Sequence, residues 1–223
     1  MNPIAWPCPL PGGGRVDEYA LVVDRARDKR LMIVPALFDE ANRLRRLTVE
    51  VMRRLDGAGI DAFLPDFPGT NESLQPLDRQ EPQDWVDAMG AASRLFGATH
   101  VLGLRGGCLF TPTNLPTLHY APAKAAALLR QMLRARTLAA REAGREETRE
   151  ALMATALSDG IELTGHRLAA EFVRQFEPMV PVPEATRIDQ ETLGGPGLWL
   201  RAEPGESRQQ ADALAAAVAM ALA

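Results

Sequence analysis

The chain has 223 residues, of which 46% are hydrophobic and 24% are charged, and its formal net charge is −4. This length suits one large α/β domain with a sizeable core, so we expect a single domain over residues 1–223. The acidic balance argues against a nucleic-acid partner. No apolar run approaches the roughly 20 residues that a membrane-spanning helix needs.

The two cysteines, Cys8 and Cys108, lie far apart and without CxxC spacing. This arrangement argues against a disulfide framework and against a structural zinc site, and we expect neither a metal nor a cofactor. The first eleven residues contain four prolines and no basic segment. We therefore expect no signal peptide and a cytoplasmic location.

Strand and helix patterns alternate through the first half of the chain, after a proline-rich extended segment over residues 1–14. The strand candidates are residues 15–24, 31–37, 60–64 and 98–104. Between them, apolar residues at helical spacing predict one helix with Asp39 as its N-cap and another with Pro82 in its first turn. This alternation predicts an α/β fold with a mostly parallel sheet flanked by helices, and ligand chemistry at the carboxyl ends of the strands.

The pattern changes in the second half. Prolines end the next helix after about one turn, and residues 117–120 form a further strand candidate. The pattern over residues 122–176 predicts helices almost throughout, which we interpret as a helical cap over the strand ends. The last elements are two strand candidates at 185–188 and 198–201 and a final helix capped by Ser207.

The segment from Gly103 to Gly107, Gly-Leu-Arg-Gly-Gly, carries the most informative pattern. It has the layout of a nucleophile elbow, Gly-x-Ser-x-Gly, in which flanking glycines allow one side chain to stand on a tight strand-to-helix turn. Arg105 occupies the serine position. A guanidinium stays protonated and only donates hydrogen bonds, so Arg105 cannot be a nucleophile.

Four segments in order carry a resemblance to a known superfamily: residues 35–46, 66–73, 103–107 and 128–168. Through them the chain resembles the α/β-hydrolase superfamily, and more closely the exosortase A system-associated hydrolases of the second type, found near bacterial genes for exopolysaccharide synthesis and protein sorting. The resemblance implies an α/β-hydrolase fold, and it implies that arginine at the elbow is a family trait. The chain departs from the family pattern at Asn71, where a glycine is expected, and at His166, where a tyrosine is expected.

The histidines do not fit a Ser-His-Asp triad. His100, His119 and His166 all precede the last two predicted strands, whereas a triad histidine follows the last strand. Cys108 and Asp66 are alternative catalytic candidates, as a thiolate nucleophile and as a general base or nucleophile. The simpler interpretations are a core cysteine and an aspartate that caps the turn after its strand.

Arg105 itself allows two hypotheses. Together with nearby backbone amides it could bind an anionic acyl or sugar-derived small molecule, and the ligand-binding candidates are then Phe38, Asp39, Glu40, Asn42, Arg105 and Gly106. Alternatively, Arg105 pairs internally with Asp39, Glu40 or Asp66 and fills the site. The chain would then be a non-catalytic pseudo-hydrolase that serves a protein partner or a second copy of itself. An open cleft at Arg105 favours the first hypothesis, and a closed, paired Arg105 favours the second.

Overall fold

The computed structural model describes residues 1–223 and contains a seven-stranded sheet in the order β1-β2-β4-β3-β5-β6-β9. Its strands are β1 (Asn2–Pro9), β2 (Arg15–Val23), β3 (Arg30–Val34), β4 (Asp61–Pro65), β5 (His100–Leu104), β6 (Thr117–Tyr120) and β9 (Thr186–Ile188). The first two strands form an antiparallel hairpin, and β2 is antiparallel to β4. From β4 to β9 all neighbours are parallel, which confirms the predicted fold class.

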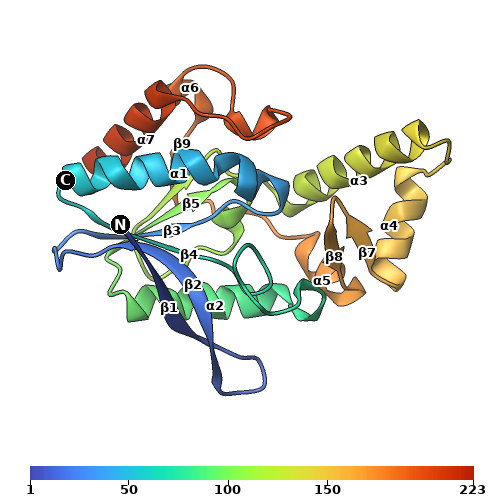
Figure 1. Ribbon diagram of the computed structural model, residues 1–223, viewed down its shortest axis with the longest axis horizontal. Coiled ribbons are helices and arrows are strands. Elements are labelled where there is room, and N and C mark those ends of the chain that lie inside the picture. The colour runs from blue at the N-terminus through green and yellow to red at the C-terminus, as the bar shows by residue number, and fades with distance from the viewer.

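Helices cover both faces of the sheet (Figure 1). The helices α1 (Asp39–Gly57) and α7 (Arg208–Ala221) lie on one face, and α2 (Pro82–Leu95) lies on the other. Side chains along β3 point alternately to the two faces of the sheet. Leu31 and Ile33 pack with residues of α1 and α7, whereas Met32 and Val34 pack with residues of α2. A strand buried on both sides therefore appears in the sequence as a continuous apolar run.

The helix starts follow the predicted signals, with one change. Pro82 is the first residue of α2, and the Ser207 side chain accepts a hydrogen bond from the Gln210 amide at the start of α7. Helix α1, however, has Phe38 as its N-cap, and Asp39 and Glu40 stand in its first turn. Acidic side chains in the first turn stabilise a helix through its dipole. Asp39 therefore does mark the start of α1, but the N-cap lies one residue earlier than predicted.

The insertion segment, residues 121–185, lies between β6 and β9. It contains α3 (Ala125–Glu142), α4 (Arg149–Ser158), the hairpin β7 (Ile161–Leu163) and β8 (His166–Leu168), and α5 (Ala170–Phe176). These elements gather at one end of the sheet (Figure 1). The prediction of helices almost throughout residues 122–176 is wrong at the hairpin. Thr164 and Gly165 both have positive φ, 49° and 82°, as a two-residue hairpin turn requires.

A further prediction is corrected at one end of the sheet. Residues 198–201 are not a strand, because Leu198–Leu200 form a short 3-10 helix and the sheet ends at β9. A short apolar run fits a buried turn as well as a strand. At the other end, the edge strand is β1, which the proline-rich first segment forms and which pairs with β2 in a hairpin. Its prolines are tolerated because an edge strand leaves half of its amides without a sheet partner.

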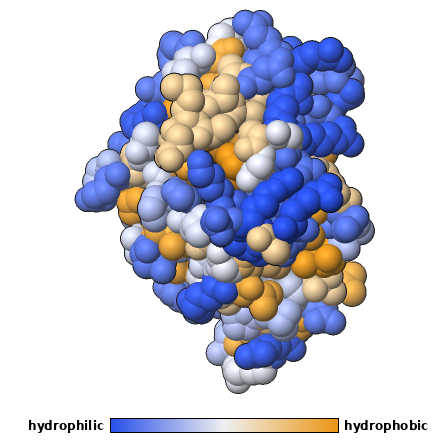
Figure 2. All heavy atoms as spheres, turned by 90° about the vertical axis from the view of Figure 1, so that its left-hand side faces the viewer, coloured by the Kyte–Doolittle hydropathy of each residue, from blue (hydrophilic) through white to orange (hydrophobic).

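Figure 2 views the molecule from the end opposite the insertion segment. Hydrophilic residues cover much of this face, a larger pale-orange apolar area lies in its upper part, and smaller apolar areas are scattered below it. No helix of the chain combines the length and the apolar character that crossing a bilayer requires.

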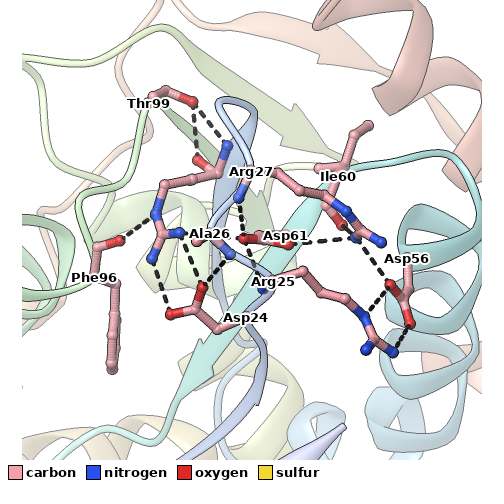
Figure 3. A network of polar contacts seen from close by, with 10 residues as sticks. Asp24, Arg25, Ala26, Arg27, Asp56, Ile60, Asp61, Phe96 and Thr99 are labelled. Atoms are coloured by element: carbon pink, nitrogen blue, oxygen red, sulfur yellow. Dashed lines mark hydrogen bonds and ion pairs between the residues drawn. The ribbon is translucent and has the colours of Figure 1, made fainter.

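A dense polar network lies where the parallel strands begin (Figure 3). The Asp61 carboxylate accepts the backbone amides of Arg25 and Arg27, each at 3.0 Å, and the side chain of Asp61 is fully buried. Arg25 and Arg27 also reach Asp56 of α1. This network fixes the loop before β3 at the amino ends of the parallel strands. The elbow after β5 lies at their carboxyl ends, so the network stabilises the fold and takes no part in the candidate site.

Candidate functional site

The elbow directly after β5 is a turn that requires glycine on both sides of Arg105. Arg105 has a positive φ of 52°, in the left-handed region. A Cβ atom on Gly107 would lie 2.2 Å from the carbonyl oxygen of Pro35, and one on Gly103 would lie 2.9 Å from the Cα of Cys108. Both contacts are closer than real Cβ atoms make, so these two positions explain the glycine pattern of the sequence.

The Arg105 side chain is fully engaged within the protein. Its Nε and Nη2 atoms each donate to the Glu40 carboxylate at 3.1 Å, and its Nη1 donates to the Ala121 carbonyl at 2.8 Å. The guanidinium lies 4.1 Å from the ring centre of Trp199, in cation–π contact. Only 15% of the side chain is exposed. The elbow is therefore occupied by a bidentate ion pair with an aromatic cover.

Glu40 comes from the first turn of α1, and its side chain is 3% exposed. Burial raises the pKa of this carboxyl, and the positive charge of Arg105 opposes that rise. A carboxylate removed from water is stable only when it is paired and hydrogen-bonded. Glu40 and Arg105 thus depend on each other for their burial.

Side chains also pack against the backbone of the elbow at Gly106. A Cβ atom on Gly106 would lie 2.7 Å from Leu128 of α3 and 2.9 Å from Leu37. A hollow of about 50 Å³ lies beside this contact, lined from α1 and its preceding loop by Leu37, Phe38, Asp39, Glu40 and Arg43, and from α3 by Leu128, Gln131, Met132 and Ala135. It has room for one or two water molecules, far below the roughly 300–1,000 Å³ of small-molecule pockets.

Comparisons with known proteins agree on the fold. No protein-family model matches the sequence, and no curated protein matches it either. Three solved structures are similar. Est1E from Butyrivibrio proteoclasticus, with bound ferulic acid, is 15% identical with a TM-score of 0.50, over 72% of this chain and 67% of that one. A putative hydrolase from Agrobacterium vitis S4 is 13% identical with a TM-score of 0.50, over 100% and 99%. DcsB, in complex with its substrate analogue, is 10% identical with a TM-score of 0.56, over 99% and 98%.

The chain has the α/β-hydrolase fold. At these identities the likeness concerns the fold alone, so the chemistry has to be argued from the residues of this chain. Within this α/β-hydrolase fold, the structure brings five predicted residues together around the elbow: Phe38, Asp39, Glu40, Arg105 and Gly106. Asn42, in contrast, is exposed on α1 and does not line the hollow.

Asp66 follows β4 and lies in a separate polar cluster. Its buried carboxylate accepts hydrogen bonds from Arg45 at 3.1 Å and from Asn71 at 3.0 Å, and burial raises the pKa of the carboxyl. Asn71, which replaces an expected glycine, keeps a positive φ of 48°. Asparagine tolerates that conformation better than most residues, so this departure from the family pattern preserves the turn.

Cys108 is 1% exposed in the core, and burial raises the pKa of its thiol far above the physiological range. His119 in β6 is equally buried, shares a hydrogen bond with Thr111 at 2.9 Å, and has its pKa lowered to about 4 by burial. His100 is the first residue of β5 and therefore lies at the opposite end of that strand from the elbow. No histidine contacts Arg105 by hydrogen bond or ion pair.

Sequence reasoning missed two residues at the site. Trp199, assigned to a strand, packs on Arg105 instead. His166 of β8 brings its Nε2 atom to 3.6 Å from Asp39, and its ring packs against the edge of Phe38. Neither contact has a local signal, because each joins segments that are more than ninety residues apart in the sequence.

Proposed function

We propose that the chain is a non-catalytic α/β-hydrolase-fold protein, a pseudo-hydrolase, that acts by binding a protein partner. The observation that carries this proposal is the buried pair of Arg105 and Glu40, which fills the elbow under Trp199 and Leu128. A closed elbow is the arrangement expected under the second of the two hypotheses. A hollow of about 50 Å³ beside it leaves too little room for an acyl or sugar substrate.

The chemistry of the residues supports the same proposal. Arg105 stands where the fold positions a nucleophile, and it is permanently protonated. The chain has no histidine after His166, so no imidazole follows the last strand. Cys108 and Asp66 are buried outside the elbow: burial raises the pKa of the Cys108 thiol and disfavours the thiolate, and the Asp66 carboxylate is held by Arg45 and Asn71. Without a nucleophile and a general base, the remaining amide donors give little hydrolytic rate.

The resemblance of four segments to the exosortase A system-associated hydrolases of the second type supports a bacterial, exopolysaccharide-related setting in the cytoplasm. The resemblance implies that an arginine elbow is a trait of that family, and we propose that in this chain the fold serves as a scaffold.

A second candidate function is the binding of an anionic acyl or sugar-derived molecule at Arg105. The bidentate geometry of Arg105 favours it, since the Nε and Nη2 atoms that hold the two carboxylate oxygens of Glu40 could hold those of another carboxylate in the same way. Such a ligand would displace Glu40 and open the contact with Leu128.

Two assays separate the candidates. We expect wild-type protein to hydrolyse p-nitrophenyl acetate and butyrate no faster than buffer, and we expect carboxylates, sugar phosphates and acyl-CoA compounds to leave its melting temperature unchanged, because only a ligand of the folded state raises it.

An ester hydrolysis rate that disappears in Arg105→Met would contradict the absence of catalysis. An anion that stabilises wild type but not the double variant Arg105→Met/Glu40→Gln would establish the second candidate. The double variant leaves no unpaired charge in the elbow, and Arg136→Met/Glu147→Gln, which removes an ion pair away from the elbow, is the matched control.

A further inference from the structure

Part of the insertion segment carries a net charge opposite in sign to that of the whole chain. Residues 125–158, which span α3, the following loop and α4, contain six arginines and four glutamates, a net charge of +2, whereas the chain as a whole carries −4. Over the whole insertion segment, residues 121–185, nine basic and nine acidic residues balance, so the positive charge lies on α3, its following loop and α4.

Most of these arginines have no internal partner. Within this stretch a single ion pair forms, between Arg136 and Glu147, with nitrogen to oxygen distances of 2.9 and 3.1 Å. The other five arginines are exposed and form no ion pair: Arg130, Arg134, Arg141, Arg145 and Arg149. Elsewhere on the molecule some exposed arginines pair with aspartates, as Arg25 does with Asp56, and unpaired ones such as Arg15, Arg79 and Arg94 lie singly on separate elements.

Three of the free arginines share one face of α3. At about 100° per residue, Arg130, Arg134 and Arg141 fall within a sector of roughly 40° and extend over about 16 Å of the helix. We name this row the arginine ridge. A row of unpaired cations at fixed spacing is suited to carboxylates that are themselves spaced along a helix.

An apolar groove runs beside the ridge, between α3 and α4, with a volume of about 640 Å³. Its floor and walls are Leu129 and Leu133 of α3 and Met153 and Leu157 of α4, together with Ala126 and Ala154. On both helices the lining positions recur every three or four residues, so each wall is one helix face. Its charged rim is formed by Arg130, Arg149, Glu150 and Glu177.

We propose that this α3–α4 groove and the arginine ridge bind an amphipathic helix of a partner protein. The apolar face of that helix enters the groove, and its acidic residues meet Arg130, Arg134 and Arg141. The inference rests on the proposed function, for which it names the surface and the chemistry of the partner. Groove-bound helices are recognised through apolar anchors at a spacing of three and four residues, which these walls provide.

Charge decides between the occupants of the groove. A second copy of this chain that docked symmetrically, through the same surface, would bring an equally basic surface against the ridge, and like charges oppose that contact. A nucleic acid has no apolar face to fill the groove, and an anionic membrane, which is flat, would meet Glu150 and Glu177 at the same time as the arginines. A helix with apolar residues and an acidic flank satisfies the ridge and the groove together.

The test uses a fluorescein-labelled synthetic helix with leucines at helical spacing and glutamates on one flank, titrated with the full chain and followed by fluorescence anisotropy. We expect binding that weakens by about tenfold or more in Arg130→Glu/Arg134→Glu/Arg141→Glu, and that weakens as salt is raised. The matched control is Arg15→Glu/Arg79→Glu/Arg94→Glu, which changes three exposed arginines without ion pairs on other elements and should bind like wild type.

A second variant, Leu157→Lys, tests the groove itself through a side chain that is 37% exposed, and we expect it to weaken binding as well. The inference is overturned if the peptide does not bind, if a lysine version of it binds equally well, or if both triple variants bind alike. Binding of phosphatidylserine-rich vesicles in place of the peptide also overturns it. Failure here leaves the absence of catalysis standing, whereas ester hydrolysis would refute the proposed function by a separate readout.

Discussion

Arg105 shows how a charge can occupy a turn that the α/β-hydrolase fold uses for a nucleophile. Each of its nitrogens has an acceptor, and its flat face is covered by Trp199. Such a pair does not make the fold more stable than a well-packed apolar pair would, because both charges have been removed from water. We expect its effect to be specificity, because a buried Glu40 carboxylate at the start of α1 requires a cation beside it.

A double-mutant cycle measures this dependence. We expect Arg105→Met and Glu40→Leu each to lower the free energy of unfolding by about 3 kcal/mol, because each leaves one charge buried without its partner. The double variant should recover most of the loss. Urea denaturation monitored by circular dichroism measures all three, with Arg167→Met as a control at a side chain that is 71% exposed. Strictly additive losses would mean that the pair is not coupled.

His119 gives the molecule a pH dependence that can be assigned to one residue. Its pKa is lowered from 6.5 to about 4 in the folded chain, so between these values only the unfolded chain binds the proton. The stability is fully present above pH 6.5 and is lost as the pH falls towards 4, by about 3 kcal/mol. His119→Gln, which can keep the hydrogen bond to Thr111, should remove this slope in urea titrations. An unchanged slope would assign the effect to other groups.

At the scale of elements, local patterns predicted what depends on neighbours in the sequence. Apolar runs gave the parallel strands, and the glycines around Arg105 gave the turn after β5. The hairpin β7–β8 was missed because strands of three residues are too short to show the alternation of apolar and polar residues. The only local sign of the hairpin is its turn at Thr164 and Gly165. The position of Trp199 could not be predicted, since its partner Arg105 belongs to another element.

The turn after β5 tolerates no side chain at Gly107. We expect Gly107→Ala to destabilise the fold by about 4 kcal/mol or more, because its Cβ would meet two backbone oxygens, of Pro35 at 2.2 Å and of Val34 at 2.6 Å, which cannot rotate away. Gly57→Ala at the end of α1, where nothing lies within 4 Å of the added atom, is the matched control and should be neutral or slightly stabilising. Equal melting temperatures for the two variants would contradict this prediction, because they would mean that the elbow can move away from the end of β3 without loss of folding free energy.

At the scale of the whole molecule, the sheet has one buried cluster on each face, and the insertion segment belongs to one of them. The cluster on the α2 face joins Met32 and Val34 of β3 to Phe172 and Phe176 of α5. Phe38, just before α1, packs edge-on against both of these phenylalanines. The proposed binding surface is therefore attached to the sheet through a shared core, although its elements lie at one end of the molecule (Figure 1).

This continuity predicts that the chain unfolds in one step. Phe172 is fully buried, and its ring lies 5.1 Å from that of Trp85 in α2. We expect Phe172→Ala to cost about 3–5 kcal/mol through the cavity that it leaves, and to lower the whole transition rather than a part of it. Tryptophan fluorescence and far-ultraviolet circular dichroism should then give coincident urea midpoints in wild type and variant. Leu138→Ala, at a side chain of α3 that is 57% exposed, is the control and should leave both midpoints in place. If the two probes separate in Phe172→Ala, the insertion segment melts by itself, and a partner helix that binds it would stabilise that segment without stabilising the sheet.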